Sequence, residues 1–452
     1  MTKPPLHPGR AVIGAMSPRR TRAAAASEAR TGTSRSGAAA SATATAPTGS
    51  GAPFLVAMFI ASMLVPIQVR VGPLLLPPYR MALLVLFIPL ALRLYSGKAG
   101  RLHAVDHLML GSALWAALAL FMNHPFGSIM ETAGLYMVEF YGAYMLGRVG
   151  VRSPEDFRRL AWAMFLILLV LLPFALVESV TRRAILLGLI PNSLPSVNAG
   201  IRFGLRRAQT VFAHPIHYGV FASICFGLAW YALDGRKSFI SRWPKAAVSG
   251  MSTFLSLSTG ALMAFVVQGI LILYEKIMEA NPRRWTIFGW GALAGYLALD
   301  LVTTKSPFHT IVHRLTFSTG SSYNRILIWQ FGSANVAKHP FFGIGMGDWE
   351  RPRYMSGSVD NFWLLTAMKF GLPSFGMLAL ALVLMIRWTS RAALPDEMSR
   401  LCRAGWLTAV GGVILGGGTV HYWANIFAFI MMIFGAGAWM IQPTGGRATA
   451  TS

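Results

Sequence analysis

The sequence is poor in charged residues and especially in carboxylates. Only 12% of its 452 residues are Asp, Glu, Lys or Arg, and 16 of them are acidic against 40 that are basic. A soluble domain carries about 25% charged residues, so this shortage excludes an ordinary soluble protein. Hydrophobic residues make up 54% of the chain and gather in continuous runs close to the length of a membrane span. We therefore expect a polytopic all-α membrane protein, because a membrane β-barrel would show alternating apolar residues.

Cysteine is nearly absent as well, and the positive charge is spread thinly. The two cysteines, Cys225 and Cys402, match no disulfide or metal-binding spacing, so we expect free thiols and neither a metal nor another cofactor. A net charge of +24 points to nucleic acid as a partner, but the basic residues are scattered between apolar runs, where they act as topology signals. We therefore exclude nucleic acid and expect membrane lipids as partners.

The apolar runs divide the chain into a membrane domain and two tails. Residues 1–52 are mostly Ala, Ser, Thr, Gly, Pro and Arg without an apolar period, which predicts a disordered basic tail rather than a cleaved signal peptide. Residues 53–441 form the membrane domain and residues 442–452 the second tail. Twelve apolar segments lie near 53–69, 74–95, 104–122, 127–147, 160–178, 210–233, 244–257, 260–275, 285–303, 361–387, 404–420 and 424–441. The seventh and eighth are short and form either two half-length helices or one re-entrant hairpin.

The basic residues also predict the orientation of the chain. With the N-terminus in the cytoplasm, five connecting loops on that side are rich in Lys and Arg, whereas three of the six outer loops have none. This is the positive-inside pattern, with both termini cytoplasmic. The outer loops 179–209 and 304–360 break it, because both contain several basic residues and few acids. We expect them to bind an anionic ligand such as a phosphate or pyrophosphate, with attraction to anionic lipid headgroups as the alternative.

The first of these loops brings three arginines close to two histidines. Arg202 and Arg206 are four residues apart, so a helix would place them on one face, and Arg207 follows directly. His214 and His217 lie about one turn apart at the start of the next segment, a spacing that metal ligands also use. No acidic or cysteine partner accompanies them, so we expect either structural histidines or contacts to a phosphate or a sugar.

The second loop, before the tenth segment, should be large and helical. The pair Ser321-Ser322 is suited to cap a short helix that ends before Pro340, and Arg325 on that helix is placed to bind phosphate. The glycines of the following FFGIGMG stretch allow a tight turn or a close approach of the backbone to a ligand. The pair Asp360-Asn361 opens the next apolar segment, where Asp360 is either a helix cap or a general base.

Charged residues inside the apolar segments need partners, because an isolated charge in the membrane is costly. Arg80 and Glu131 both lie near the outer ends of their segments, which predicts that they pair; otherwise Glu131 reaches interfacial water. Glu139 lies deeper on the same broad helix face as Glu131. Lys369, about two turns into the tenth segment, also needs a partner.

Five short motifs follow one another along the chain. They are a Phe-x-His-Pro step, a Ser/Thr-Gly element, Arg-x-x-x-Trp, His-Pro-x-x-Gly-x-Gly-x-Gly, and Asn-x-x-Leu followed by Gly-Leu-Pro. Their residues are Phe212–Pro215, Ser256–Gly260, Arg325–Trp329, His339–Gly347 and Asn361–Pro373. In this order they resemble the family of bacterial O-antigen ligases and O-antigen or exopolysaccharide polymerases. The resemblance covers about residues 53–441, and the last three motifs are its most specific part.

The resemblance implies a glycosyltransferase of the bacterial inner membrane that acts at the periplasmic face. Such enzymes take a glycan from an undecaprenyl-pyrophosphate carrier and transfer it, without a metal and with inversion, to an acceptor hydroxyl. Arginines hold the pyrophosphate, which is the leaving group, and stabilisation of that anion is a sound way to lower the barrier. A chain-length regulator is a further partner that the resemblance leaves open. The substrate-binding set that we expect is Arg80, Arg202, Arg206, Arg207, Arg325, Asn361 and His217.

One position departs from the family pattern. Many members, ligases especially, have His before the Asn of Asn-x-x-Leu, and this chain has Asp360 there. If that histidine is the base, its role passes to Asp360, His339 or His214. The departure favours a polymerase of exopolysaccharide or O-antigen repeat units over a ligase that transfers the glycan to lipid A core. A transporter of an anionic or lipid-linked solute is the alternative from another class, but the polar residues concentrate in the loops of one face.

Overall fold

The structure is a computed structural model that describes residues 52–72, 74–194, 200–233, 238, 240–302 and 319–442. The chain divides into two units, Met1–Pro47 and Thr48–Ser452, and every described residue belongs to the second. The predicted tails at 1–52 and 442–452 therefore lie almost wholly outside the described residues. The same holds for Lys305 and Arg314 of the second outer loop.

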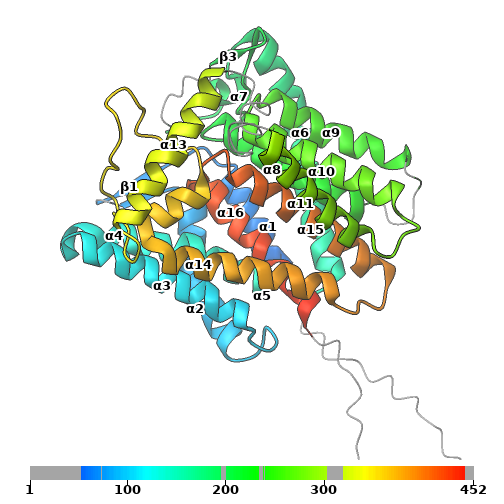
Figure 1. Ribbon diagram of the computed structural model, residues 1–452, viewed down its shortest axis with the longest axis horizontal. Coiled ribbons are helices and arrows are strands. Elements are labelled where there is room, and N and C mark those ends of the chain that lie inside the picture. The colour runs from blue at the N-terminus through cyan, green and yellow to red at the C-terminus, as the bar shows by residue number, and fades with distance from the viewer. Residues whose placement is uncertain are drawn as a thin grey trace, which may run out of the picture. The chain divides into compact units, whose positions relative to one another are not determined.

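The described residues form helices and two small antiparallel hairpins (Figure 1). The helices of the first half are α1 (Pro53–Met63), α2 (Pro78–Tyr95), α3 (Ala104–Asn123), α4 (Phe126–Met137), the π-helical turn η1 (Val138–Gly142), α5 (Ala143–Gly150), α6 (Pro154–Thr181), α7 (Ile185–Leu189) and α8 (Pro215–Ala232). Those of the second half are η2 (Ile240–Arg242), α9 (Trp243–Leu255), α10 (Thr259–Ile277), α11 (Arg284–Val302), α13 (Thr319–Lys338), α14 (Phe362–Arg391), α15 (Glu397–Gly417), α16 (Ala424–Gly435) and η3 (Ala438–Ile441). The hairpins pair β1 (Val69–Val71) with β2 (Leu74–Leu76), and β3 (Ile201–Arg202) with β4 (Leu205–Arg206).

Seven of the described helical stretches are long and apolar enough to cross a membrane. They are α2, α3, α6, α10, α11, α14 and the stretch Ala424–Ile441 that begins with α16. A helix satisfies its own backbone hydrogen bonds where water is absent, which is why continuous apolar runs fold this way. The described chain is therefore an α-helical membrane protein. The other five apolar segments of the sequence are helical too, as α1, α4 with α5, α8, α9 and α15, but they are shorter or less apolar, so twelve crossings stay a prediction.

The stretch that begins with α16 is the most buried of the seven (Figure 1, red). It packs closely on α5, because two glycines let the backbones touch. A Cβ on Gly147 would lie 2.0 Å from Met432 O, and one on Gly435 would lie 2.1 Å from Tyr144 O. No real Cβ fits at such distances, so these two positions require glycine. The close packing fixes the C-terminal part of α16, a helix whose first residues line one wall of the candidate site.

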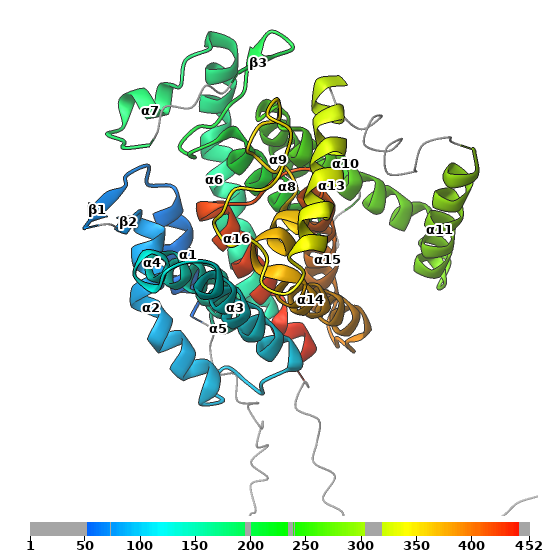
Figure 2. The same cartoon turned by 60° about the vertical axis from the view of Figure 1, so that its left-hand side comes forward.

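Helices α3 and α14 lie side by side in both ribbon views (Figures 1 and 2). Two buried serines join them: Ser112 Oγ donates to Ser374 O at 2.9 Å, and Ser374 Oγ donates to Ser112 O at 3.0 Å. Each hydroxyl thus reaches the backbone of the opposite helix, which satisfies both polar groups away from water. This contact holds the long helix α14 in place beside the site.

Helix α14 is interrupted at Gly371, whose backbone (φ 79°, ψ 171°) is not helical. Pro373 has no N–H group, so the carbonyl of Lys369 lacks its usual donor four residues on. The N–H of Leu372 bonds outside the helix, to Pro340 O at 2.7 Å. The interruption therefore leaves two carbonyls of α14 without a partner from their own helix.

The glycine segment (Phe341–Gly347) supplies the missing donors. Ile344 N donates to Met368 O at 2.8 Å, and Gly345 N donates to Lys369 O at 2.9 Å. Gly343 and Gly345 both adopt a φ of 59°, in the left-handed region that favours glycine. The glycines of FFGIGMG therefore allow a close backbone approach to helix α14, whereas the sequence predicted a tight turn or an approach to a ligand.

The second outer loop contains α13, as expected of a helical loop. The helix ends at Lys338, before Pro340, because the residue that precedes a proline disfavours the helical region. The expected start is wrong. α13 begins at Thr319, so Ser321-Ser322 lie inside its first turn and do not precede it as a cap. Arg325 lies about two turns into the helix.

Candidate functional site

Two adjoining cavities lie where the outer loops meet α14 and the segment between α15 and α16. The larger one, which we name the arginine cavity, has a volume of about 500 Å³. It is lined by Arg202, Arg207, His214, Ile216, Ser258, Thr259, Gly260, Asn324, Arg325, Ser358, Asp360, Thr419, Val420, His421 and Trp423. Three guanidinium groups and one carboxylate give its lining a net formal charge of +2 when the histidines are neutral. Such a cavity favours an anionic ligand.

The β3–β4 hairpin, and not a helix, positions the arginines of the first outer loop. Its register pairs Arg202 with Leu205, so the expected helical face does not exist. Arg202 Nη1 donates to Leu257 O at 2.8 Å, and Arg207 Nε donates to Ser256 O at 3.3 Å. The turn between α9 and α10, which are two separate helices, thus holds both guanidinium groups at the cavity wall.

Arg206 has a different role from the one expected. It does not line the arginine cavity, because successive residues of an extended chain point to opposite sides and Arg207 takes the inner side. Arg206 Nε lies 3.5 Å from Glu178 Oε1, and Thr210 N donates to the other oxygen of that buried carboxylate at 2.9 Å. The Arg206–Glu178 ion pair ties the hairpin to α6, so it is a structural contact.

Arg325 extends from α13 into the arginine cavity. Its Nε is buried, and it has no hydrogen bond among the described residues. Burial lowers the pKa of Arg325, Asp360 opposes that effect, and the positive charge of Arg202 adds to it. A bound anion would supply the missing hydrogen bond and favour the charged guanidinium. The same logic applies to Arg207, whose pKa falls to about 10 through burial and through Arg202 nearby, against the effect of Asp360.

Asp360 lines the arginine cavity, and its neighbour caps the helix. Asn361 Oδ1 accepts a hydrogen bond from Leu364 N at 3.0 Å, which makes Asn361 the N-cap of α14. Asn361, predicted to bind substrate, is buried and does not line the cavity, so the structure gives it a helix-capping role. The alternative of Asp360 as a cap is wrong. Its carboxylate accepts from Ser358 Oγ at 3.2 Å and is otherwise close to the arginines.

Two histidines line the arginine cavity. His214 Nδ1 accepts from Ile216 N at 3.1 Å and so caps α8, and burial together with the charge of Arg207 lowers its pKa to about 4. His421 lies in the segment between α15 and α16; burial, with the charge of Lys369, lowers its pKa to about 4. Both are neutral imidazoles at neutral pH. Because Nδ1 of His214 already accepts from Ile216 N, its Nε2 carries the proton and can only donate to a ligand, whereas a neutral His421 has one donor and one acceptor nitrogen. Sequence reasoning missed His421, because one histidine in a short uncharged loop gives no signal.

The two other predicted histidines lie away from the arginine cavity. His217 is fully buried in α8, where its ring packs against Trp423 at a centroid distance of 4.4 Å. It supports the cavity wall from behind and does not contact the space inside. His339 is exposed at the end of α13, and only its backbone takes part in hydrogen bonds, with Asn335 and Gly343. The structure therefore does not bring His217, predicted as a substrate contact, or His339, predicted as a base, to the lining of the arginine cavity.

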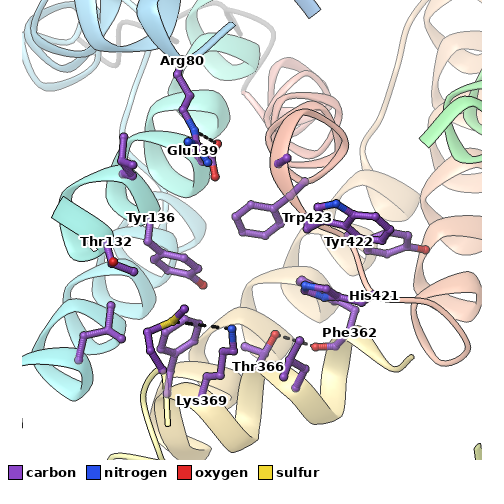
Figure 3. Close-up of a pocket in the computed structure, with 17 residues that line it drawn as sticks. Arg80, Thr132, Tyr136, Glu139, Phe362, Thr366, Lys369, His421, Tyr422 and Trp423 are labelled. Atoms are coloured by element: carbon purple, nitrogen blue, oxygen red, sulfur yellow. Dashed lines mark hydrogen bonds and ion pairs between the residues drawn. The ribbon is translucent and has the colours of Figure 1, made fainter. Parts of the chain in front are cut away.

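The smaller cavity, which we name the lysine cavity, has a volume of about 300 Å³ (Figure 3). Its lining is mainly apolar, and it shares His421 and Trp423 with the arginine cavity. It is lined by Arg80, Leu120, Thr132, Leu135, Tyr136, Glu139, Met346, Phe362, Leu365, Thr366, Lys369, Phe370, His421, Tyr422, Trp423, Ala424 and Phe427. His421 and Trp423 therefore form a wall that the two cavities share.

Arg80 lines the lysine cavity, but with a different partner from the one predicted. Its Nε lies 2.6 Å from Oε1 of Glu139, and Tyr79 OH donates to the same oxygen at 2.5 Å. Glu139 sits in the π-helical turn η1, where the extra residue in the turn shifts its side chain. The predicted Arg80–Glu131 pair is therefore wrong. Figure 3 shows Arg80 and Glu139 on one side of the cavity and Lys369 on the opposite side.

Among the described residues, no group of three or more His, Cys, Asp or Glu is arranged to hold a metal ion. Cys225 and Cys402 are both free, as predicted, and both are buried.

No protein-family model matches this chain, and a search of curated proteins finds no match either. The functional interpretation therefore depends on the motifs and on the geometry of the two cavities.

Proposed function

We propose that this protein is a metal-independent glycosyltransferase that polymerises undecaprenyl-pyrophosphate-linked repeat units into exopolysaccharide or O-antigen. The observation that supports it best is the arginine cavity. Three guanidinium groups from two distant parts of the chain meet there, and the buried Nε–H of Arg325 has no hydrogen-bond partner among the described residues. Arginine is suited to pyrophosphate, because its planar fork donates two hydrogen bonds to neighbouring oxygens.

In the proposed reaction, the acceptor hydroxyl oxygen attacks the anomeric carbon of the donor glycan. The bond from that carbon to the pyrophosphate oxygen breaks, and its electron pair stays on the pyrophosphate. Arg202, Arg207 and Arg325 stabilise the charge that develops there, in a cavity where water does not need to reorganise. The proton of the acceptor hydroxyl passes to a base in the same cavity, so charge and atoms balance.

Asp360 is the base in this proposal. It is the one carboxylate among the residues that line the arginine cavity, and it occupies the position before the Asn of the Asn-x-x-Leu motif. A histidine is usually the better base at neutral pH, but burial lowers the pKa of His214 and His421 to about 4 and removes that advantage. The two histidines instead form hydrogen bonds with the sugars, with His214 as a donor through its Nε2–H.

The membrane arrangement that goes with this function has twelve spans, both termini in the cytoplasm and the two cavities near the periplasmic face of the inner membrane. The seven long apolar helices support the membrane location. The arginines that line the cavity come from loops that violate the positive-inside pattern, and a role for them in binding gives a reason for that violation.

Deletion of the gene in its native host, followed by gel analysis of surface glycans, tests the function. Loss of a polymerase leaves single repeat units, whereas loss of a ligase leaves long chains on the carrier lipid. Complementation with Asp360→Asn should give at least about 100-fold less polymer, as expected for a lost general base, while Asn361 still caps α14. Normal glycans in the deletion strain would refute the enzyme, and binding of the glycan without transfer by the purified protein would favour a transporter.

A further inference from the structure

The lysine cavity contains a cation without a counter-charge. The only hydrogen-bond partner of Lys369 Nζ is Met346 Sδ, at 3.8 Å, and no carboxylate of the described residues lies within 4 Å of it. Glu139, on the opposite side of the cavity, already accepts from Arg80 and Tyr79 (Figure 3). A cation held beside apolar walls without a partner costs free energy, so an anionic group of a ligand is the natural partner of Lys369.

The remaining walls of the lysine cavity suit a hydrocarbon chain. Leu120, Leu135, Phe362, Phe370 and Phe427 are among the apolar residues that line it. These side chains come from α3, α4, α14 and α16, four elements that are far apart in the sequence. A volume of about 300 Å³ lies at the lower end of known ligand sites. The expected ligand is therefore an amphiphile with an anionic head and a slender apolar body.

The shared wall places that head beside the arginine cavity. His421 and Trp423 line both cavities, and Lys369 is close enough to His421 to contribute to its low pKa. His421 Nδ1 is buried and has no hydrogen bond among the described residues. One ligand that passes this wall would therefore meet Lys369 on the apolar side and Arg325 on the polar side.

Building on the proposed function, we propose that the two cavities hold one polyprenyl diphosphate between them. The lysine cavity takes the first isoprene units and the lipid-side phosphate, which binds Lys369. The arginine cavity takes the sugar-side phosphate, which binds Arg325, Arg202 and Arg207. The lysine cavity then selects a lipid-linked diphosphate over free pyrophosphate, because a free pyrophosphate gains nothing from its apolar walls.

Three probes separate the two halves of this site: farnesyl diphosphate, farnesyl monophosphate and inorganic pyrophosphate. The measurement is their affinity for the purified full-length protein in detergent. Lys369→Met should weaken both farnesyl ligands about ten-fold or more, which is the loss expected for one charged hydrogen bond, and should leave pyrophosphate within about two-fold. Arg325→Ala should weaken farnesyl diphosphate and pyrophosphate and leave the monophosphate unchanged.

Two further variants keep the test independent of folding. Thr132→Trp fills the lysine cavity without changing its charge, and it should weaken the farnesyl ligands and leave pyrophosphate unchanged. Lys338→Met removes an exposed lysine that pairs with Glu350, and it should change none of the three affinities. If Lys369→Met and Thr132→Trp both bind farnesyl monophosphate as wild type does, the lysine cavity is not the lipid site. If pyrophosphate binding is independent of Arg325, the proposed function fails, whatever Lys369 does.

Discussion

The two cavities differ in how their cations are neutralised. In the lysine cavity, Arg80 already has a carboxylate partner at 2.6 Å, and only Lys369 is left without one. In the arginine cavity, three guanidinium groups share one nearby carboxylate, Asp360, which approaches none of them within the 4 Å of an ion pair. The protein thus uses ion pairs to hold its frame and keeps unpaired cations where a ligand is expected. The same comparison separates Arg206 from its neighbour Arg207.

The largest effect should come from Arg325→Ala. Removal of a donor that stabilises a developing charge lowers the turnover rate about 10²–10³-fold, so we expect that loss in polymer formation by isolated membranes. Lys338→Ala on the same helix is the matched control, because Lys338 is exposed and far from the cavity. Equal rates of polymer formation for the Arg325 variant and wild type would contradict a role for the unpaired arginines of this cavity in binding substrate.

Arg206→Ala should act on stability and only through it on activity. It leaves the buried carboxylate of Glu178 without its cation, and the loss of one partner of a buried pair costs about 3–5 kcal/mol. The variant should be less abundant in membranes and unfold at a lower temperature in detergent. Arg206→Lys should recover part of that loss. If the Arg206→Ala protein has a normal melting temperature but no activity, Arg206 binds substrate and is not only a structural residue.

Gly371→Ala tests whether the broken helix α14 shapes the lysine cavity. A Cβ at this position would lie 2.0 Å from Phe341 O, and the φ of 79° is strained for alanine, so we expect a cost of about 1–3 kcal/mol. The glycine segment should detach from α14 and carry Met346 away from the cavity. Gly376 lies in the same helix and has open space where a Cβ would be added, so Gly376→Ala should leave the unfolding midpoint unchanged. Thermal unfolding of both variants checks this, and equal midpoints would contradict it.

The smallest effect concerns pH. The pKa of His421 is lowered to about 4 in the folded protein, against about 6.5 for an unperturbed histidine. Between these values the unfolded chain binds the extra proton, so stability is lost as the pH falls from about 6.5 towards 4. His421→Gln cannot titrate and should lose less of its melting temperature between pH 7.5 and pH 5. An identical loss in variant and wild type would show that the imidazole is not buried as described.

Most of the fold was predictable from the sequence, because its causes are local. Runs of apolar residues near 20 in length form helices in a membrane wherever they pack, and Pro340 ends α13 whatever surrounds it. The arginines of the candidate site were also visible in the sequence, since the two loops predicted on the outer side are basic, against a charge rule that is counted along the chain. The choice among those arginines was not visible.

That choice depends on contacts between residues far apart in the chain, and only the tertiary structure decides it. Arg206 pairs with Glu178 because the β3–β4 hairpin points its side chain away from the arginine cavity. Arg207 and Arg325 line that cavity together, although more than a hundred residues of sequence separate them. His421 is part of the candidate site because it lines both cavities, and Lys369 because it lines the lysine cavity. No sequence motif indicates either position. The sequence by itself determines which chemistry the outer loops contain. The packing of α14 and α16 determines which side chains face one another, because distance in space sets an electrostatic interaction and distance along the chain does not.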